Sequence, residues 1–168
     1  MLIIIGGLPG TGKTTIARDL ARRINGLLLR IDSIEQALRD SGAVREDVKD
    51  AGYRIAYAVA EENLKLGRTV IADCVNPIQL TRDAWVATAL RADMECAEVE
   101  IVCSDQEVHR RRLTERATDI DGLKLPTWQE VLDREYHAWN RKHIVIDTAG
   151  RSVSECVEQL RKKLAAMS

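Results

Sequence analysis

The stretch GLPGTGKT, residues 7–14, decides the fold of this chain. It matches the pattern G-x-x-x-x-G-K-[ST] of a phosphate-binding loop, which has physical meaning when a strand precedes it and a helix follows it. Residues 2–5 form a short apolar run typical of a buried strand, and residues 14–24 carry apolar side chains at helical spacing. The sequence therefore predicts a central strand that leads through an anion-binding loop into the N-terminus of a helix.

The residue types in this loop suit a polyphosphate. Glycine has no Cβ, so the backbone at Gly10 and Gly12 can adopt left-handed conformations and direct N–H groups at phosphate oxygens. The ammonium of Lys13 is expected at the β- and γ-phosphates, and the hydroxyl of Thr14 on Mg²⁺, beside the positive end of the helix dipole. We therefore assign seven residues of this segment to a nucleotide site: Gly7, Gly10, Thr11, Gly12, Lys13, Thr14 and Thr15.

Length, charge and cysteine usage narrow the class of protein. The 168 residues suit one domain, and a net charge of −1 excludes the strong basic field that drives non-specific binding to nucleic acid. The four cysteines form no C-x-x-C pair, which indicates free thiols rather than a disulfide or a zinc site. The apolar N-terminal run is too short for a signal peptide or a membrane span. We therefore expect a soluble, cytoplasmic protein with no membrane partner, acting as a monomer or homodimer.

The remaining apolar runs alternate with helical patterns. This alternation predicts an α/β fold in which a mostly parallel sheet has helices on both faces. Four more strands are expected at residues 27–31, 69–72, 97–103 and 144–146. Helices are expected at residues 33–38, 46–66, 78–91, 105–116, 127–140 and 152–166, and Thr127 and Glu130 have the spacing of a capping box.

Carboxylates follow two of the predicted strands, at the edge where open α/β sheets bind ligands. Asp32 follows the second strand and could accept or orient the proton of a hydroxyl during phosphoryl transfer, or it could cap the helix expected at Ser33. Asp73 ends the run TVIAD, which has the form of a Walker B element that holds Mg²⁺, although a simple turn residue is the alternative. Asn76 comes soon after and could contact substrate or backbone.

The run HRRRLTER precedes a polar, glycine-containing segment at residues 116–127 that could move as a lid. Arg112 and Arg116 are spaced i and i+4, so they are expected on one helix face. Guanidinium groups suit both a nucleotide base and a developing phosphoryl charge. The alternative is a solvated basic face, which we prefer for Arg110 and Arg111.

Two further features are weaker signals. Residues 147–150 match the D-x-x-G motif of GTPase switches, but the chain has no N-K-x-D motif. We therefore expect only main-chain contact with a nucleotide base near Gly150. The three histidines are scattered, and roles in packing or at the surface are favoured over catalysis.

The combination of the loop, the two strand-end carboxylates and an R-x-x-x-R helix leading into a lid resembles the small P-loop kinases. Within that superfamily the chain is similar to kinases often labelled AAA-family ATPases, whose relatives include chloramphenicol phosphotransferase, zeta toxin, gluconate kinase, adenylylsulfate kinase and polynucleotide kinase. The resemblance covers nearly the whole chain. It implies a three-layer P-loop NTPase fold with five parallel strands in the order 2-3-1-4-5, and ATP with Mg²⁺ as the donor. It also implies Asp32 as the base, Arg112 against adenine and Arg116 on the phosphates.

The resemblance leaves the acceptor open. Within a single kinase domain at residues 1–168, residues 33–66 are expected to bind it. The favoured function is an ATP-dependent phosphotransferase that acts on a hydroxyl of a small molecule. The alternatives are a polynucleotide or nucleoside 5′-hydroxyl kinase, which the lack of a basic stripe disfavours, and a nucleotide-dependent switch with slow hydrolysis. The candidate acceptor contacts are Asp32, Arg39, Tyr53, Arg54, Tyr57 and Asn76.

Overall fold

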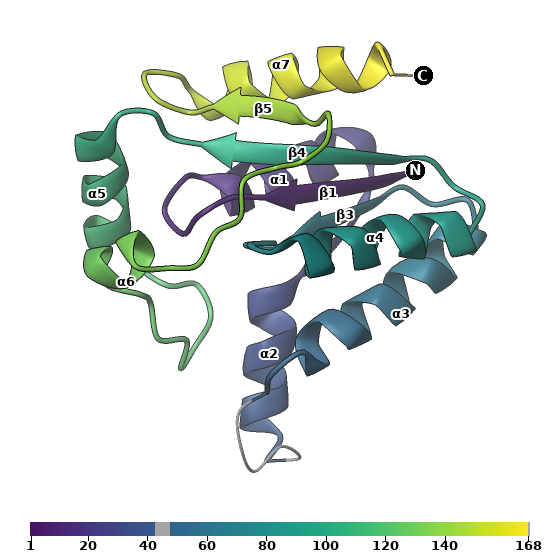
Figure 1. Ribbon diagram of the computed structural model, residues 1–168, viewed down its shortest axis with the longest axis horizontal. Coiled ribbons are helices and arrows are strands. Elements are labelled where there is room, and N and C mark those ends of the chain that lie inside the picture. The colour runs from purple at the N-terminus through teal and green to yellow at the C-terminus, as the bar shows by residue number, and fades with distance from the viewer. Residues whose placement is uncertain (43–47, 168) are drawn as a thin grey trace.

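Five strands form one parallel sheet in the order β2-β3-β1-β4-β5, as the resemblance implied (Figure 1). The structure is a computed structural model that describes residues 1–42 and 48–167. The first apolar run becomes the central strand, with all of its residues buried, because neighbours pair with it on both sides. The strands are β1 (Leu2–Gly6), β2 (Leu27–Arg30), β3 (Val70–Asp73), β4 (Cys96–Val102) and β5 (Ile144–Asp147).

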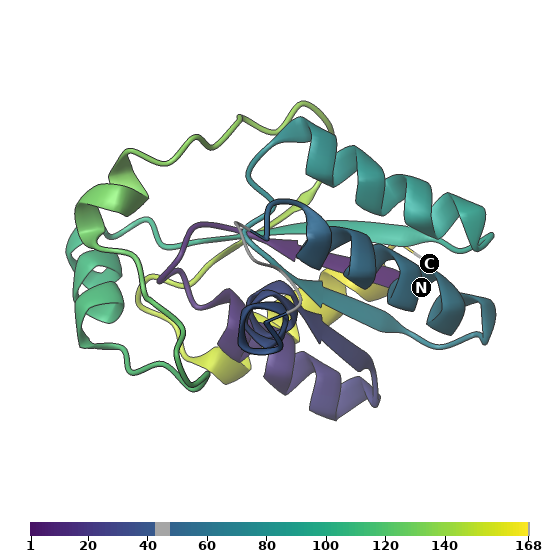
Figure 2. The ribbon, with the colours of Figure 1, turned by 90° about the horizontal axis from the view of Figure 1, so that it is seen from below.

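Helices cover both faces of the sheet, which completes the predicted three-layer fold. Figure 2 shows α3 (Ala51–Lys65) and α4 (Gln79–Arg91) on one side of the sheet, and α1 (Lys13–Ile24) and α7 (Val153–Ala165) on the other. Successive side chains of β1 point to opposite faces, as the pleat of a strand requires. Each face therefore has its own apolar core.

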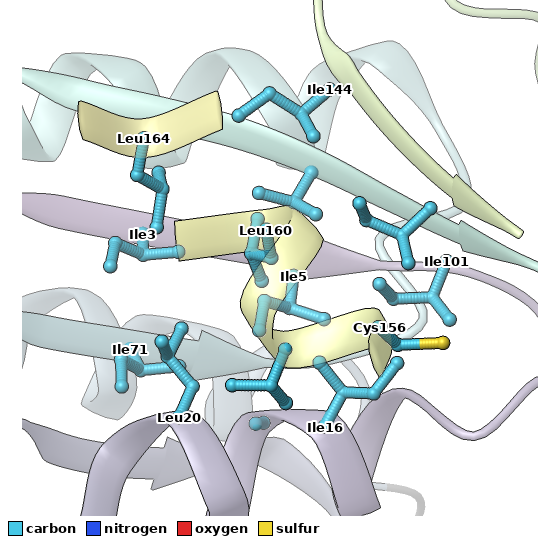
Figure 3. Close-up of a cluster of buried hydrophobic side chains, with 14 of the residues drawn as sticks. Ile3, Ile5, Ile16, Leu20, Ile71, Ile101, Ile144, Cys156, Leu160 and Leu164 are labelled. Atoms are coloured by element: carbon cyan, nitrogen blue, oxygen red, sulfur yellow. The ribbon is translucent and has the colours of Figure 1, made fainter. Parts of the chain in front are cut away.

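The two cores divide the side chains of β1 between them. Ile3 and Ile5 pack with α1 and α7 in the cluster shown in Figure 3. Leu2 and Ile4 pack on the other side with α3 and α4, around the fully buried ring of Trp85. Because both faces bury apolar side chains, the loop that follows β1 starts from a strand fixed on all sides.

Three further helices lie at the carboxyl ends of the strands: α2 (Ile31–Asp40), α5 (Gln106–Glu115) and α6 (Trp128–Leu132) (Figure 1). The alternative role of Asp32, as an N-cap, is excluded, because α2 already begins at Ile31 and has no side-chain capping bond. Helix α5 ends at Glu115, and the backbone of Arg116 is extended (φ −71°, ψ 131°). Arg112 and Arg116 therefore do not share a helix face, contrary to the prediction.

The helix expected at residues 127–140 is much shorter. Its capping box forms as predicted between Thr127 and Glu130, but the helix ends at Leu132. The chain then runs from α6 past α4 to β5 (Figure 2). The buried Arg82 binds this segment. The guanidinium of Arg82 donates to the carbonyl oxygens of His137 (2.8 Å) and Ala138 (3.2 Å). These tertiary contacts override the local helical pattern.

Other boundaries differ by a few residues, apart from the helix expected at residues 46–66. That helix is observed as Ala51–Lys65, and its expected first turn falls partly outside the described residues. The four cysteines are free. Among the residues that the structure describes, no helix combines the length and apolar character that crossing a membrane requires.

Candidate active site

The phosphate-binding loop has the predicted left-handed glycines. Gly10 has φ 87° and Gly12 has φ 97°. A Cβ on Gly10 would lie 3.1 Å from the ring of His109, which is tighter than an ordinary contact and adds to the preference for glycine there. His109 supports the loop, since its Nε2 lies 2.8 Å from the carbonyl oxygen of Pro9 and its ring packs edge-on against Trp128. Helices α5 and α6 therefore hold the loop from outside.

Lys13 and Asp73 are buried side by side below the loop. Burial lowers the pKa of Lys13, and the charges of Asp73 and Asp32 oppose this change. Burial also raises the pKa of Asp73, while the charge of Lys13 and the hydroxyl of Thr14 oppose the rise. Among the described residues, neither oxygen of Asp73 has a hydrogen-bond partner of good geometry. A buried carboxylate beside a threonine hydroxyl supplies the hard oxygen ligands that Mg²⁺ prefers, so these residues fit that ion.

A first pocket, which we call the loop pocket, has a volume of about 430 Å³ and opens beside the phosphate-binding loop. The first residues of the lid and the segment after β5 complete its wall. Of the predicted residues it contains Gly10, Gly12, Lys13, Thr14, Thr15, Arg112 and Arg116. It also contains residues that were not predicted: Ile16, Arg18, Arg30, Ala117, Asp119, Thr148, Arg151, Val153 and Cys156.

Thr148 connects two parts of the wall of the loop pocket, Arg112 and the phosphate-binding loop. Its hydroxyl donates to the carbonyl oxygen of Thr11 at 2.8 Å, and Arg112 donates to its Oγ1 (2.8 Å) and its carbonyl oxygen (3.1 Å). The guanidinium of Arg112 is thus fixed in the pocket wall. Gly150 forms a left-handed turn (φ 65°) two residues on, but its atoms do not line the pocket. Gly7 and Thr11 also lie behind the surface of the loop rather than on the pocket wall.

A second pocket, which we call the lid pocket, has a volume of about 400 Å³ and lies between α2 and the lid. Lys13 and Arg116 line both pockets, so the two cavities meet at these cations. Asp32 and Arg39 line the lid pocket, as predicted for acceptor contacts. Its other walls come from α2, from the loop after β3 and from residues 122–126 of the lid, and Arg134 closes one side.

Four predicted acceptor residues do not line the lid pocket. Tyr53 accepts a hydrogen bond from the backbone N–H of Asn76 (3.2 Å), and the side chain of Asn76 is fully buried. Tyr57 donates to the carbonyl oxygen of Thr81 at 3.4 Å, and Arg54 is exposed on α3. Tyr53, Tyr57 and Asn76 thus hold α3 and the β3–α4 connection in place behind the pocket.

Arg30 is the residue that the sequence interpretation missed most clearly. It is buried at the end of β2, and its guanidinium faces three carboxylates: Asp119 at 2.9 Å, Asp32 at 3.6 Å and Asp73 at 3.9 Å. Arg18 makes a second ion pair with Asp119. Hydrogen bonds from Arg18 and Arg30 hold the pKa of Asp119 well below its usual range. A charged residue at the end of an apolar strand was the available signal for Arg30, and the sequence carries none for Asp119.

The family described as AAA domain matches residues 2–136. The chain belongs to this AAA domain family. Uncharacterized proteins of Mycobacterium tuberculosis and Mycobacterium bovis are each 31% identical to it over 170 residues, which cover 92% of this chain and 33% of the relative. This chain of the AAA domain family therefore spans about a third of the length of these curated relatives.

Solved structures of small kinases share the fold of this AAA domain. The APS kinase of Mycobacterium tuberculosis, in complex with AMPPNP and APS, superposes with a TM-score of 0.72 at 20% identity over 98% of this chain and 96% of that chain. A gluconokinase from Sinorhizobium meliloti superposes with a TM-score of 0.62 at 18% identity over 99% and 96% of the two chains. The protein thus has a P-loop, nucleotide-binding kinase fold.

Proposed function

We propose that this protein is an ATP-dependent phosphotransferase that moves the γ-phosphoryl group of ATP to a hydroxyl of a small molecule. The observation that carries the proposal is the meeting of two pockets at Lys13 and Arg116. ATP would occupy the loop pocket and the acceptor the lid pocket. A nucleotide switch needs only the first pocket, whereas group transfer needs a second cavity that opens on the transferred phosphoryl.

Each charged residue at this junction has a role in the proposed reaction. Asp32 would accept or orient the proton of the acceptor hydroxyl as that oxygen attacks the γ-phosphorus. Lys13 and Arg116 would stabilise the charge on the oxygens of the transferring group, in a site where Lys13 is already desolvated. Thr14 and Asp73 would hold Mg²⁺, which neutralises charge on the β- and γ-phosphates when it is bound. Arg112, fixed by Thr148, would lie against the base.

The size of the lid pocket favours a small acceptor. About 400 Å³ is the volume of a small-molecule site, and residues 122–126 of the lid close it on one side. We therefore propose a sugar, an antibiotic or a nucleoside-like compound rather than the end of a polynucleotide. The protein would act as a monomer or homodimer in the cytoplasm.

A screen of acceptors tests the reaction. ADP release would be measured with ATP and Mg²⁺ in the presence of sugars, sugar acids, aminoglycosides, phenicols, nucleosides and oligonucleotides with a 5′-hydroxyl. One class of small molecule should raise ADP release far above the basal rate and appear as a phosphorylated product. Stimulation by oligonucleotides alone would favour the end-kinase alternative. Slow hydrolysis that no acceptor changes would favour the switch.

The variant Asp32→Asn tests the role of the base. With the stimulating acceptor, kcat should fall by about 10² to 10⁴-fold because the amide cannot accept the proton, while nucleotide affinity stays nearly constant. Glu62→Gln is the matched control, since it also removes one carboxylate charge but lies on α3 outside both pockets. If the Asp32→Asn enzyme has the same turnover as the control, Asp32 is not the base.

A further inference from the structure

The lid pocket carries an excess of positive charge that the chain as a whole does not. The protein has 25 lysines and arginines against 26 aspartates and glutamates. The wall of the lid pocket has two carboxylates, Asp32 and Glu35, against five cations. The cations are Lys13, Arg39, Arg116, Lys124 and Arg134.

Three of these cations already have a proposed role or an ion-pair partner. Lys13 and Arg116 also line the loop pocket, so they face the phosphoryl group that the proposed function transfers. Arg39 lies 3.5 Å from the carboxylate of Glu35, one helical turn away on α2. Lys124 and Arg134 remain. Within residues 1–42 and 48–167, the side chain of neither makes an ion pair or a hydrogen bond.

Lys124 and Arg134 flank the short helix α6. Lys124 precedes this five-residue helix and Arg134 follows it, and both line the lid pocket. Glu130, within α6, lies between the two in sequence and accepts hydrogen bonds from Thr127 at 2.7 and 2.9 Å. Asp133 and Glu135, which flank Arg134, are bonded to Gln129 and His137. The hydrogen bonds from Thr127 lower the pKa of Glu130 most, and the charges of Lys124 and Arg134 add to this effect. Glu130 thus makes no ion pair with either cation and does not line the pocket.

Two cations that make no ion pair or hydrogen bond among the described residues, in the wall of a pocket that has Asp32 on α2, match a ligand with an anionic end and a hydroxyl end. We propose that the acceptor carries an oxyanion group, a carboxylate, phosphate or sulfate, which Lys124 and Arg134 bind while its hydroxyl lies beside Asp32. Arginine and lysine both bind such groups through charge-assisted hydrogen bonds. This inference rests on the proposed function, because it assumes that the lid pocket holds the acceptor.

Binding of inorganic sulfate tests the inference without any knowledge of the acceptor. The protein is first loaded with AMPPNP and Mg²⁺, and nucleotide binding is measured, so that the loop pocket is filled. Sulfate is then titrated against chloride at constant ionic strength by calorimetry. We expect millimolar binding that the double variant Lys124→Ala/Arg134→Ala weakens at least tenfold. The matched control Arg110→Ala/Lys142→Ala removes the same charges from exposed positions outside both pockets and should leave the affinity unchanged.

The outcomes separate the inference from the proposed function. Failure of AMPPNP to bind would remove the proposed function, and the sulfate titration would then be compared between the unloaded proteins. Sulfate binding that is absent, or equal in the wild type and the Lys124→Ala/Arg134→Ala variant, would overturn the oxyanion site even if AMPPNP binds normally.

Paired acceptors give a second test. D-gluconate is compared with D-sorbitol, and glycerol 3-phosphate with glycerol, as acceptors in the ADP-release assay. The anionic member should be the better acceptor, and Lys124→Ala/Arg134→Ala should raise its KM at least tenfold with kcat changed less than threefold, since the lost contact lies away from the reacting hydroxyl. Preference for the neutral member of each pair would overturn the inference.

Discussion

Two buried arginines near the carboxyl ends of the strands have different kinds of partner. Arg82, fully buried, donates to four backbone carbonyl oxygens, of Asn76, Pro77, His137 and Ala138, and its guanidinium lies 4.1 Å from the ring centre of Trp139. Arg30 instead faces the carboxylates of Asp32, Asp73 and Asp119.

This difference separates scaffold from site. Carbonyls and aromatic rings keep their charge distribution at every pH and with every ligand, so Arg82 fixes the chain between α6 and β5 permanently. The partners of Arg30 are an aspartate that we assign to the acceptor, one that we assign to Mg²⁺ and one on the lid. Changes in the region of Arg82 should therefore alter stability, and changes at Asp32, Asp73 and the adjacent Lys13, around Arg30, should alter turnover.

Lys13→Ala should give the largest effect and lies in the region of Arg30. Loss of the cation at the transferring group should lower kcat by about 10³-fold, equivalent to about 4 kcal/mol. The fold should survive, because the loop owes its shape to Gly10 and Gly12. Steady-state kinetics and thermal unfolding measure the two quantities, with the exposed Lys162→Ala as control. A Lys13→Ala protein with wild-type turnover would remove the phosphate-binding interpretation.

Arg82→Ala should lower the stability of the protein rather than its turnover. Four backbone carbonyl oxygens lose a hydrogen bond from a buried guanidinium, so the free energy of unfolding should fall by about 3 kcal/mol, measured with urea. Arg91→Ala on the same helix removes an exposed ion pair with Glu61 and should cost less than about 1 kcal/mol. Below its unfolding transition, the Arg82→Ala protein should keep kcat within a few-fold of wild type. Normal stability with lost turnover would contradict the division of roles.

Arg112 and Arg116 should differ from each other although both line the loop pocket. Arg116→Ala should lower kcat by about 10- to 100-fold with a smaller change in nucleotide affinity, because Arg116 lies where the two pockets meet. Arg112→Ala should mainly weaken nucleotide binding, since its guanidinium is fixed against Thr148. Nucleotide titrations beside steady-state kinetics measure both. Small and equal effects would favour the alternative that both arginines belong to a solvated basic face.

Asp119→Asn should have the smallest effect, on stability. The ion pairs of Asp119 lower its pKa in the folded state, so they stabilise the protein above the pKa of the unfolded carboxyl, about 4, and this stabilisation is lost as pH falls through the folded pKa. The side chain is 46% exposed, so the contribution should stay below about 1 kcal/mol. Urea unfolding should therefore distinguish wild type from Asp119→Asn at pH 7 and less so as pH falls below about 4. Asp121→Asn, on the same lid, is the control, and an equal loss in both would contradict the ion-pair explanation.

The sequence predicted those features that depend on short-range patterns. The loop at residues 7–14, the strands around it and the carboxylate of Asp73 each follow from a run of neighbouring residues. The capping box of Thr127 and Glu130 is local too, and it forms. Helix α6 stops early because Arg82, more than fifty residues away in the chain, binds the segment that would continue it. No periodicity in residues 127–140 carries that information.

The site residues that the sequence did not predict also depend on contacts between distant parts of the chain. Arg30 and Asp119 are separated by 89 positions, and only the folded lid brings them together. Tyr53 and Tyr57 were expected at the acceptor because they lie within residues 33–66, the segment expected to bind it. The turn of α3 directs them instead toward Asn76 and Trp85, where burial of their rings contributes more than exposure in a polar pocket.

The position of β1 at the centre of the sheet has a consequence for how the chain folds. Leu2 pairs with Val70 on one side and with Cys96 on the other, and the order of the chain supplies these partners long after the apolar strand itself. During synthesis, about sixty-five residues therefore follow the run from Leu2 to Ile5 before its first strand neighbour is made, and about ninety before its second. Parallel pairings of this range form slowly and expose apolar edges meanwhile. The strand that leads into the phosphate-binding loop is therefore an apolar segment exposed to aggregation before the sheet closes.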